Sequence, residues 1–85
     1  MPYIDKESRL ELLVEGREIQ TPGELNYTIT KLVHQYIRKF GRKYDTLNTV
    51  VGVLEAAKME LYREVVGPYE DVKKSENGPV SEIDK

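Results

Sequence analysis

The chain has 85 residues, of which 39% are hydrophobic and 33% are charged, and this length and composition fit one globular domain with a modest core. It contains no cysteine, which excludes disulfide frameworks, thiolate zinc sites and cysteine nucleophiles. The formal net charge of −2 excludes a generally basic coat for nucleic acid.

The N-terminal segment predicts a short first helix. Asp5 or Ser8 can cap its start, and it ends at Gly16 or runs on towards Ile19, a boundary that the pattern leaves open. Its apolar stripe consists of Leu10, Leu13 and Val14.

The second helix has the strongest signals. The sequence Thr21-Pro22-Gly23-Glu24 is typical of a capping box, in which Thr21 caps the helix and Glu24 reaches back. Gly41 is a natural terminator. The apolar residues follow a spacing of threes and fours, which predicts one helical stripe. They are Leu25, Ile29, Leu32, Val33, Tyr36, Ile37 and Phe40.

A third helix is expected from Asp45 or Thr46 to about Val66, where Gly67-Pro68 should stop it. Its stripe consists of Leu47, Val50, Val51, Leu54, Ala57, Leu61 and Val65. Beyond it, residues 69–76 can form one or two helical turns before the breaker Asn77-Gly78-Pro79. We therefore predict an all-α fold, a three-helix bundle of residues 1–76 with a short C-terminal extension, followed by a flexible, disordered acidic tail over 77–85.

The charge is unevenly distributed along the chain. Residues 1–24 hold six acids and three bases, whereas residues 25–44 hold five bases and no acid. We favour the interpretation that this basic helix balances acidic neighbours in the bundle. The alternative is a face that binds nucleic acid or another anionic partner. The residues expected to make such contacts are Lys31, Arg38, Lys39, Arg42 and Lys43.

A polar line runs beside the apolar stripe of the third helix. Asn48, Glu55 and Tyr62 on this line are candidates for a small polar pocket, with Glu55 as acid or base. Such chemistry requires a shielded carboxyl, and a solvent-open Glu55 contradicts it. We favour a structural role for this line and expect no enzymatic activity. Tyr69 either anchors back on the bundle, which we favour, or docks into a partner.

Metal and cofactor signals are weak. Glu11, Glu15 and Glu18 resemble half of a magnesium site, but the basic second helix offers no facing acids, and His34 is the only histidine. We expect no metal and no cofactor. No apolar run is long enough for a membrane span, and the N-terminus turns acidic too early for a signal peptide. A cytoplasmic location without membrane contact is therefore expected.

Three parts of the sequence carry a resemblance: Thr21 to Tyr27, Asn48 to Arg63, and Pro68-Tyr69-Glu70-Asp71 through Asn77-Gly78. Together they resemble a family of small uncharacterised helical proteins of phage and prophage type, over roughly residues 1–80. The resemblance implies a compact helical protein and a viral or mobile-element origin, and it implies no activity or catalytic residue. We expect a binding or accessory protein with a protein partner, self-association as a homodimer being one form, and nucleic-acid binding as the alternative.

Overall fold

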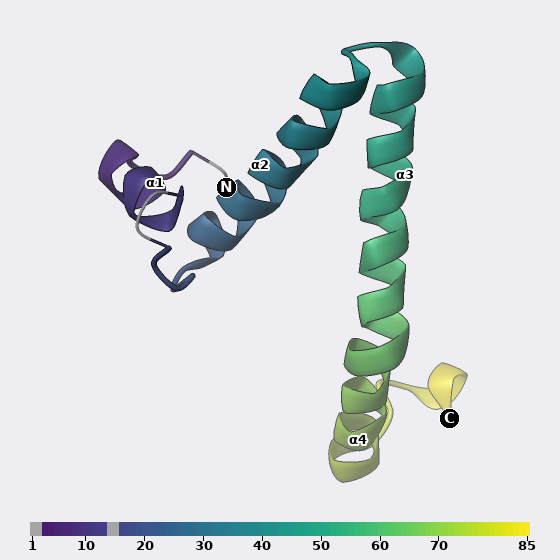
Figure 1. The fold of residues 1–85 in the computed structure, drawn as a ribbon. Coiled ribbons are helices and arrows are strands. Elements are labelled where there is room, and N and C mark those ends of the chain that lie inside the picture. Colours follow the sequence, from purple (N-terminus) through teal and green to yellow (C-terminus); the bar gives the residue numbers. More distant parts are fainter. Residues whose placement is uncertain (1–2, 14–15) are drawn as a thin grey trace. The chain divides into compact units, whose positions relative to one another are not determined.

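The computed structural model describes residues 3–13 and 16–85, and these residues form helices and no strand, which confirms the all-α prediction (Figure 1). The main helices are α1 (Lys6–Leu13), α2 (Pro22–Phe40), α3 (Tyr44–Leu61) and α4 (Gly67–Asn77). A π-helical segment, Tyr62–Val66, joins α3 to α4, and a 3₁₀ turn spans Glu82–Asp84. The chain divides into two compact units, Met1–Val50 and Val51–Lys85, which are described separately.

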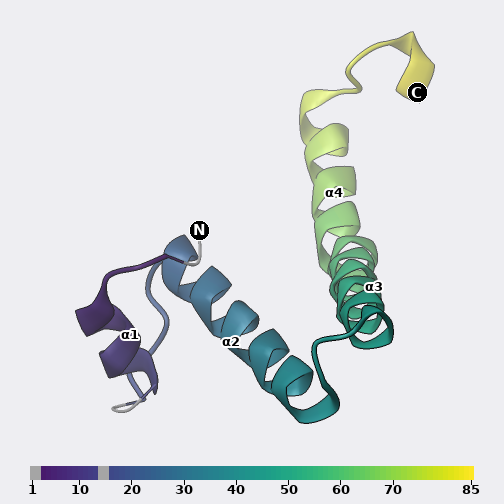
Figure 2. The ribbon, with the colours of Figure 1, turned by 90° about the horizontal axis from the view of Figure 1, so that it is seen from above.

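In the first unit, α1 packs against α2, and the front and top views both place it beside the N-terminal half of α2 (Figures 1 and 2). Asp5 is the residue that caps α1. Its carboxylate accepts hydrogen bonds from the backbone N–H of Ser8 at 2.9 Å and from the Ser8 hydroxyl at 3.1 Å. Gly16 has a φ of 67°, in the left-handed region that favours glycine. The predicted positions Val14 and Glu15 lie outside the described residues.

Helix α2 begins and ends where the sequence predicts. The Thr21 hydroxyl accepts a hydrogen bond from the Glu24 N–H at 3.1 Å, Pro22 lies in the first turn, and Gly41 closes the helix with a φ of 102°. Tyr27 of α2 is buried, and so are Thr46 and Val50 in the first turns of α3. Most other large apolar side chains of this unit are more than 40% exposed. Within the described residues of this unit, helix packing therefore leaves much apolar surface uncovered.

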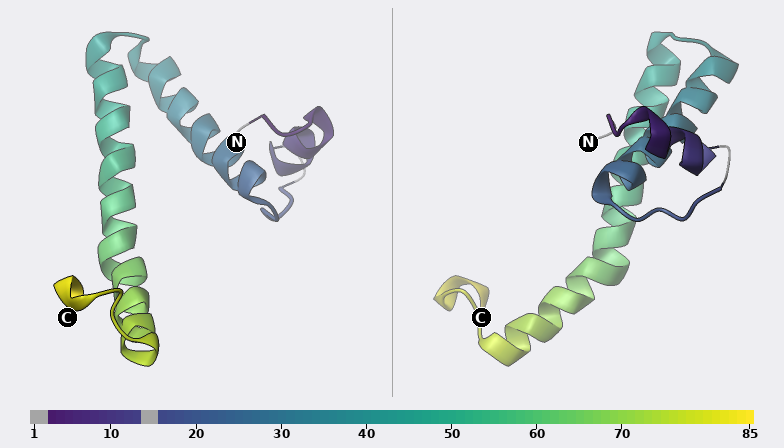
Figure 3. Two further views of the ribbon diagram at one scale, coloured as in Figure 1. Left: turned by 180° about the vertical axis from the view of Figure 1, so that it is seen from behind. Right: turned by 90° about the vertical axis from the view of Figure 1, so that its left-hand side faces the viewer.

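In the second unit the helix continues beyond the point where Gly67-Pro68 was expected to stop it, so that prediction is wrong (Figure 3). Proline lacks the N–H of an α-helical turn, and its ring would collide with the carbonyl four residues earlier. The chain avoids this collision with a wider π turn, in which the Gly67 N–H bonds to the Tyr62 carbonyl, five residues back. A Cβ at residue 67 would lie only 3.2 Å from that carbonyl oxygen, so glycine suits this position.

Helix α4 then ends at Asn77, and Gly78 follows with a φ of 86°, as the breaker sequence predicts. Beyond it, the Ser81 hydroxyl caps the short 3₁₀ turn, and the Asp84 carboxylate accepts hydrogen bonds from the backbone N–H groups of Val80 and Ser81. The flexibility of residues 77–85 stays a prediction. Across residues 3–13 and 16–85, no helix is both long enough and apolar enough to cross a membrane.

Candidate functional site

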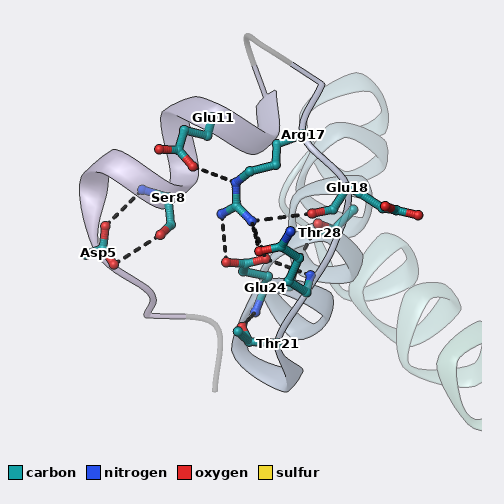
Figure 4. Close-up of polar contacts among 9 residues, drawn as sticks. Asp5, Ser8, Glu11, Arg17, Glu18, Thr21, Glu24 and Thr28 are labelled. Carbon is teal, nitrogen blue, oxygen red and sulfur yellow. Dashed lines mark hydrogen bonds and ion pairs between the residues drawn. The ribbon is translucent and has the colours of Figure 1, made fainter.

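A polar cluster lies where the segment before α2 meets α1 (Figure 4). The guanidinium of Arg17 donates to both carboxylate oxygens of Glu24, at 3.1 and 2.7 Å, and pairs with the carboxylate of Glu11. Glu24 is 5% exposed, and its carboxylate also accepts a hydrogen bond from the Gln20 backbone N–H at 2.9 Å. We call Glu11, Arg17 and Glu24 the ionic clasp, because these residues connect α1, and the segment between α1 and α2, to α2.

The charge states of the ionic clasp reinforce one another. The hydrogen bonds from Arg17, followed by that from Gln20, hold the pKa of Glu24 below its ordinary value. The same pairing raises the pKa of Arg17. Both groups are therefore charged at neutral pH, and they are hydrogen-bonded to each other. This arrangement has a structural role, since the bidentate pair leaves Glu24 unsuited to proton transfer.

The sequence predicts Glu24 as a capping residue but does not reveal its partner Arg17. The carboxylate reaches back to the Gln20 N–H rather than to that of Thr21. Arg17 lies seven residues before Glu24, in a segment without helical periodicity, so no pattern of three or four residues could reveal the pair.

A shallow cleft of about 270 Å³ is lined by residues of α1 and the segment before it and by residues 27–34 of α2. Within it, the Arg9 guanidinium lies 5.2 Å from the ring centroid of Tyr27, and its Nε donates to the Ile4 carbonyl at 2.8 Å. The lining residues are Tyr3, Arg9, Tyr27, Thr30, Lys31 and His34. We call the five residues expected to contact an anionic partner, Lys31, Arg38, Lys39, Arg42 and Lys43, the basic face. Lys31 of the basic face lies in this cleft, and His34 is exposed.

The other four residues of the basic face lie together on the last turn of α2 and the turn that follows. All four are exposed, and the ammonium of Lys39 lies 5.4 Å from the centroid of the Phe40 ring. Within the described part of the chain, no carboxylate pairs with them or with Lys31. No ion pair in this part of the chain therefore supports the interpretation that the basic helix balances the charge of acidic neighbours. The four residues are Arg38, Lys39, Arg42 and Lys43.

The polar line of α3 does not form an enclosed site. Glu55 and Tyr62 border the same open surface hollow, but Asn48 is not part of it, and all three are exposed. The Glu55 carboxylate pairs with the ammonium of Lys58, three residues later, at 3.6 Å. Because Glu55 is open to solvent, the enzymatic interpretation loses the shielded carboxyl that it requires.

The acidic residues proposed as half of a magnesium site do not converge. Glu11 pairs with Arg17, Glu18 is exposed, and Glu15 lies outside the described residues. Among residues 3–13 and 16–85, no group of three or more histidine, aspartate or glutamate side chains is placed to hold a metal ion.

Helix α3 carries an exposed apolar stripe. Leucine recurs at intervals of seven along α3, at Leu47, Leu54 and Leu61, and each is at least 40% exposed. A second series with the same interval, Val51, Lys58 and Val65, lies beside the leucines on the same side of the helix. Its two valines are about 60% exposed. We call both series together the heptad face. It consists of Leu47, Val51, Leu54, Lys58, Leu61 and Val65.

Tyr69 keeps the anchoring role favoured from the sequence only as a prediction, since the two units are described separately. It is 59% exposed on α4, and the ammonium of Lys73 lies 5.7 Å from the centroid of its ring.

The sequence model of the family described as "Domain of unknown function (DUF6899)" matches residues 1–80. No curated protein and no solved structure matches the chain.

Proposed function

Since the chain belongs to the DUF6899 family, whose description assigns no activity, we propose from its geometry that it is a helical protein-interaction module acting through the heptad face. The observation that carries this proposal is the exposure of five large apolar side chains in a regular seam. Seams with this repeat pack against a second helix by inserting their side chains between those of the partner.

The composition of α3 supports the need for a partner. An isolated helix in water is marginal, and most helical stability in proteins comes from packing of an apolar face. Helix α3 contains several β-branched residues and the glycine Gly52, all of which lower intrinsic helix propensity. Its exposed apolar seam therefore needs a covering helix for α3 to persist.

The proposal is tested by site-specific photo-crosslinking of the full chain in the cells that make it. A photoreactive amino acid at Leu54, on the heptad face, should crosslink to protein, whether to another copy or to a different chain. The matched control is Val53, which is 61% exposed but lies outside the heptad face. Equal or absent crosslinking from both positions contradicts the proposal.

The second candidate function is binding of nucleic acid through the basic face, favoured by the absence of ion pairs to these residues in the described part of the chain. Four to five phosphate contacts predict that affinity for duplex DNA falls about 100- to 500-fold between 50 and 200 mM salt. Fluorescence anisotropy with labelled single-stranded and duplex DNA tests this dependence. The control replaces Arg38, Lys39, Arg42 and Lys43 by glutamine, and absence of binding at 50 mM salt refutes this function.

The proposed module is a non-enzymatic protein without cofactor, and we place it in the cytoplasm. Lack of cysteine supports this location, because a chain without disulfides has no need of an oxidising compartment. The phage or prophage origin rests on the sequence resemblance alone and stays a prediction.

A further inference from the structure

We propose that a second copy of this chain covers the heptad face, with the two α3 helices antiparallel and a two-fold axis between Leu54 and Lys58. This inference rests on the proposed function and names the partner. Neither α1 nor α2 is long enough to cover the whole helical stretch of residues 44–77, which carries the heptad face. Helix α2 has 19 residues and spans about 28 Å, whereas residues 44–77 span about 50 Å.

The turn between α2 and α3 limits what α2 can cover. It contains only residues 41–43, so α2 can reach no farther along the next helix than about residue 62. Val65 and Tyr69 lie beyond that reach, and both are nearly 60% exposed. Helix α1 is already packed on α2. A covering helix of matching length is available in a second copy of the same chain.

The face is complementary to itself when two copies run in opposite directions. A two-fold axis between Leu54 and Lys58 sets Leu47 against Val65 of the second copy and Val51 against Leu61 of the second copy. Every layer outside the centre then pairs leucine with valine, which suits the close packing of such seams. A two-fold arrangement of this kind also closes, so it stops at two chains.

The charges of the seam distinguish antiparallel from parallel packing. A parallel arrangement sets Lys58 opposite Lys58 of the second copy, which brings like charges together. The antiparallel arrangement sets Lys58 opposite Leu54 and beside Glu55 of the second copy. In the single chain the Lys58 ammonium lies 3.6 Å from the carboxylate of its own Glu55.

The π segment extends the same seam beyond the proline. One extra residue in the π turn moves the next position of the leucine series from Pro68 to Tyr69. Pro68 consequently lies off the seam. In the antiparallel register, Tyr69 then meets Tyr44 of the second copy, and Tyr44 is 80% exposed in the single chain.

The absence of native cysteine allows a direct test by disulfide trapping in the full-length chain. Leu47→Cys and Val65→Cys variants, each oxidised alone, should remain largely uncrosslinked, and their mixture should form a disulfide-linked heterodimer. Crosslinking of each variant alone and not in the mixture, or no crosslinking anywhere, overturns the proposal. Val53→Cys, outside the seam, is the matched control and should not crosslink.

A second measurement covers the case in which a cysteine variant fails to fold. Sedimentation equilibrium of the native chain should show a monomer–dimer equilibrium, and Lys58→Glu should weaken dimerisation at least tenfold by repelling Glu55 of the second copy. The Glu55→Lys/Lys58→Glu double variant should restore it. A native chain that is monomeric at all concentrations overturns the second-copy proposal. If Leu54 then still crosslinks to a different protein, the proposed function stands without it.

Discussion

Substitution of Gly52 by alanine reports which side of α3 is covered. Gly52 lies in the helix interior, and a Cβ built there has no atom of the chain within 4 Å. Alanine is favoured over glycine in a helix interior by about 1 kcal/mol. In the heptad register this position lies one residue after Val51, on the side away from the seam. The variant should therefore raise the free energy of unfolding by about 1 kcal/mol.

A gain of this size corresponds to a rise of about 4 to 8 °C in melting temperature for a domain of 60–100 residues. The assay is thermal unfolding followed by far-ultraviolet circular dichroism, at one fixed protein concentration because self-association would shift the transition. A lower melting temperature for Gly52→Ala refutes the reasoning. It would mean that the backbone of another helix lies against this glycine, and the interface would then lie along the polar line rather than the heptad face.

Gly78→Ala is the matched control for this experiment. A Cβ at Gly78 also meets nothing within 4 Å, but the backbone has a φ of 86°. Residues with a Cβ lose about 1–2 kcal/mol in that left-handed conformation. The two variants make the same chemical change in open space, and they should change the melting temperature in opposite directions.

Three further predictions concern the helix ends. Thr21→Ala should lower the free energy of unfolding by about 1 kcal/mol, because it removes the cap of α2, as urea unfolding would measure. The α1–α2 packing should weaken in acid. Because Arg17 holds the pKa of Glu24 below its ordinary value of 4.5, the carboxylate stabilises the fold above pH 4.5 and this contribution is lost as the pH falls through the lowered pKa. Hydrogen exchange of α2 amides against pH would show it. Pro68→Ala should convert the π segment to α-helix, since residue 68 regains an N–H that can bond to the Glu64 carbonyl, and the gain is at most about 3 kcal/mol. NMR chemical shifts of residues 62–66 would report the change.

Each of these predictions has its own control. Thr21→Ser keeps the hydroxyl and should keep the stability, so equal losses in both variants would rule out the cap as the cause. Glu24→Gln should remove the acid dependence of α2 exchange, and an unchanged pH profile would assign that dependence to another carboxylate. Persistence of the π signature in Pro68→Ala would show that Gly67 and its neighbours, rather than the proline, set the wider turn.

Local signals made the ends of α2 predictable. Capping by Thr21 and termination by Gly41 depend on residues within one turn of the helix end, and the sequence shows such residues directly. The continuation through Pro68 was not predictable in this way. It depends on a hydrogen bond from Gly67 to the Tyr62 carbonyl, a geometry that residue preferences for α-helices do not encode.

The interaction surfaces were predictable only in part. The seven-residue interval of leucines in α3 is visible in the sequence, but periodicity alone favours a covered stripe and does not show which residues stay exposed. The Arg17–Glu24 pair joins an irregular segment to a helix and follows no period. The sequence therefore indicated the faces of the helices, while the partners of individual side chains depended on tertiary geometry.

The ionic clasp also bears on the order in which the chain folds during its synthesis. Its longest connection joins Glu11 and Glu24 through the shared Arg17, so every contact closes a loop shorter than fifteen residues. Loops of about ten residues close within 10–100 ns, whereas a ribosome adds only about 5–20 residues per second. The clasp can consequently form as soon as α2 emerges, long before α3 and α4 have been translated. The N-terminal unit then needs nothing from the later part of the chain to join α1 to α2.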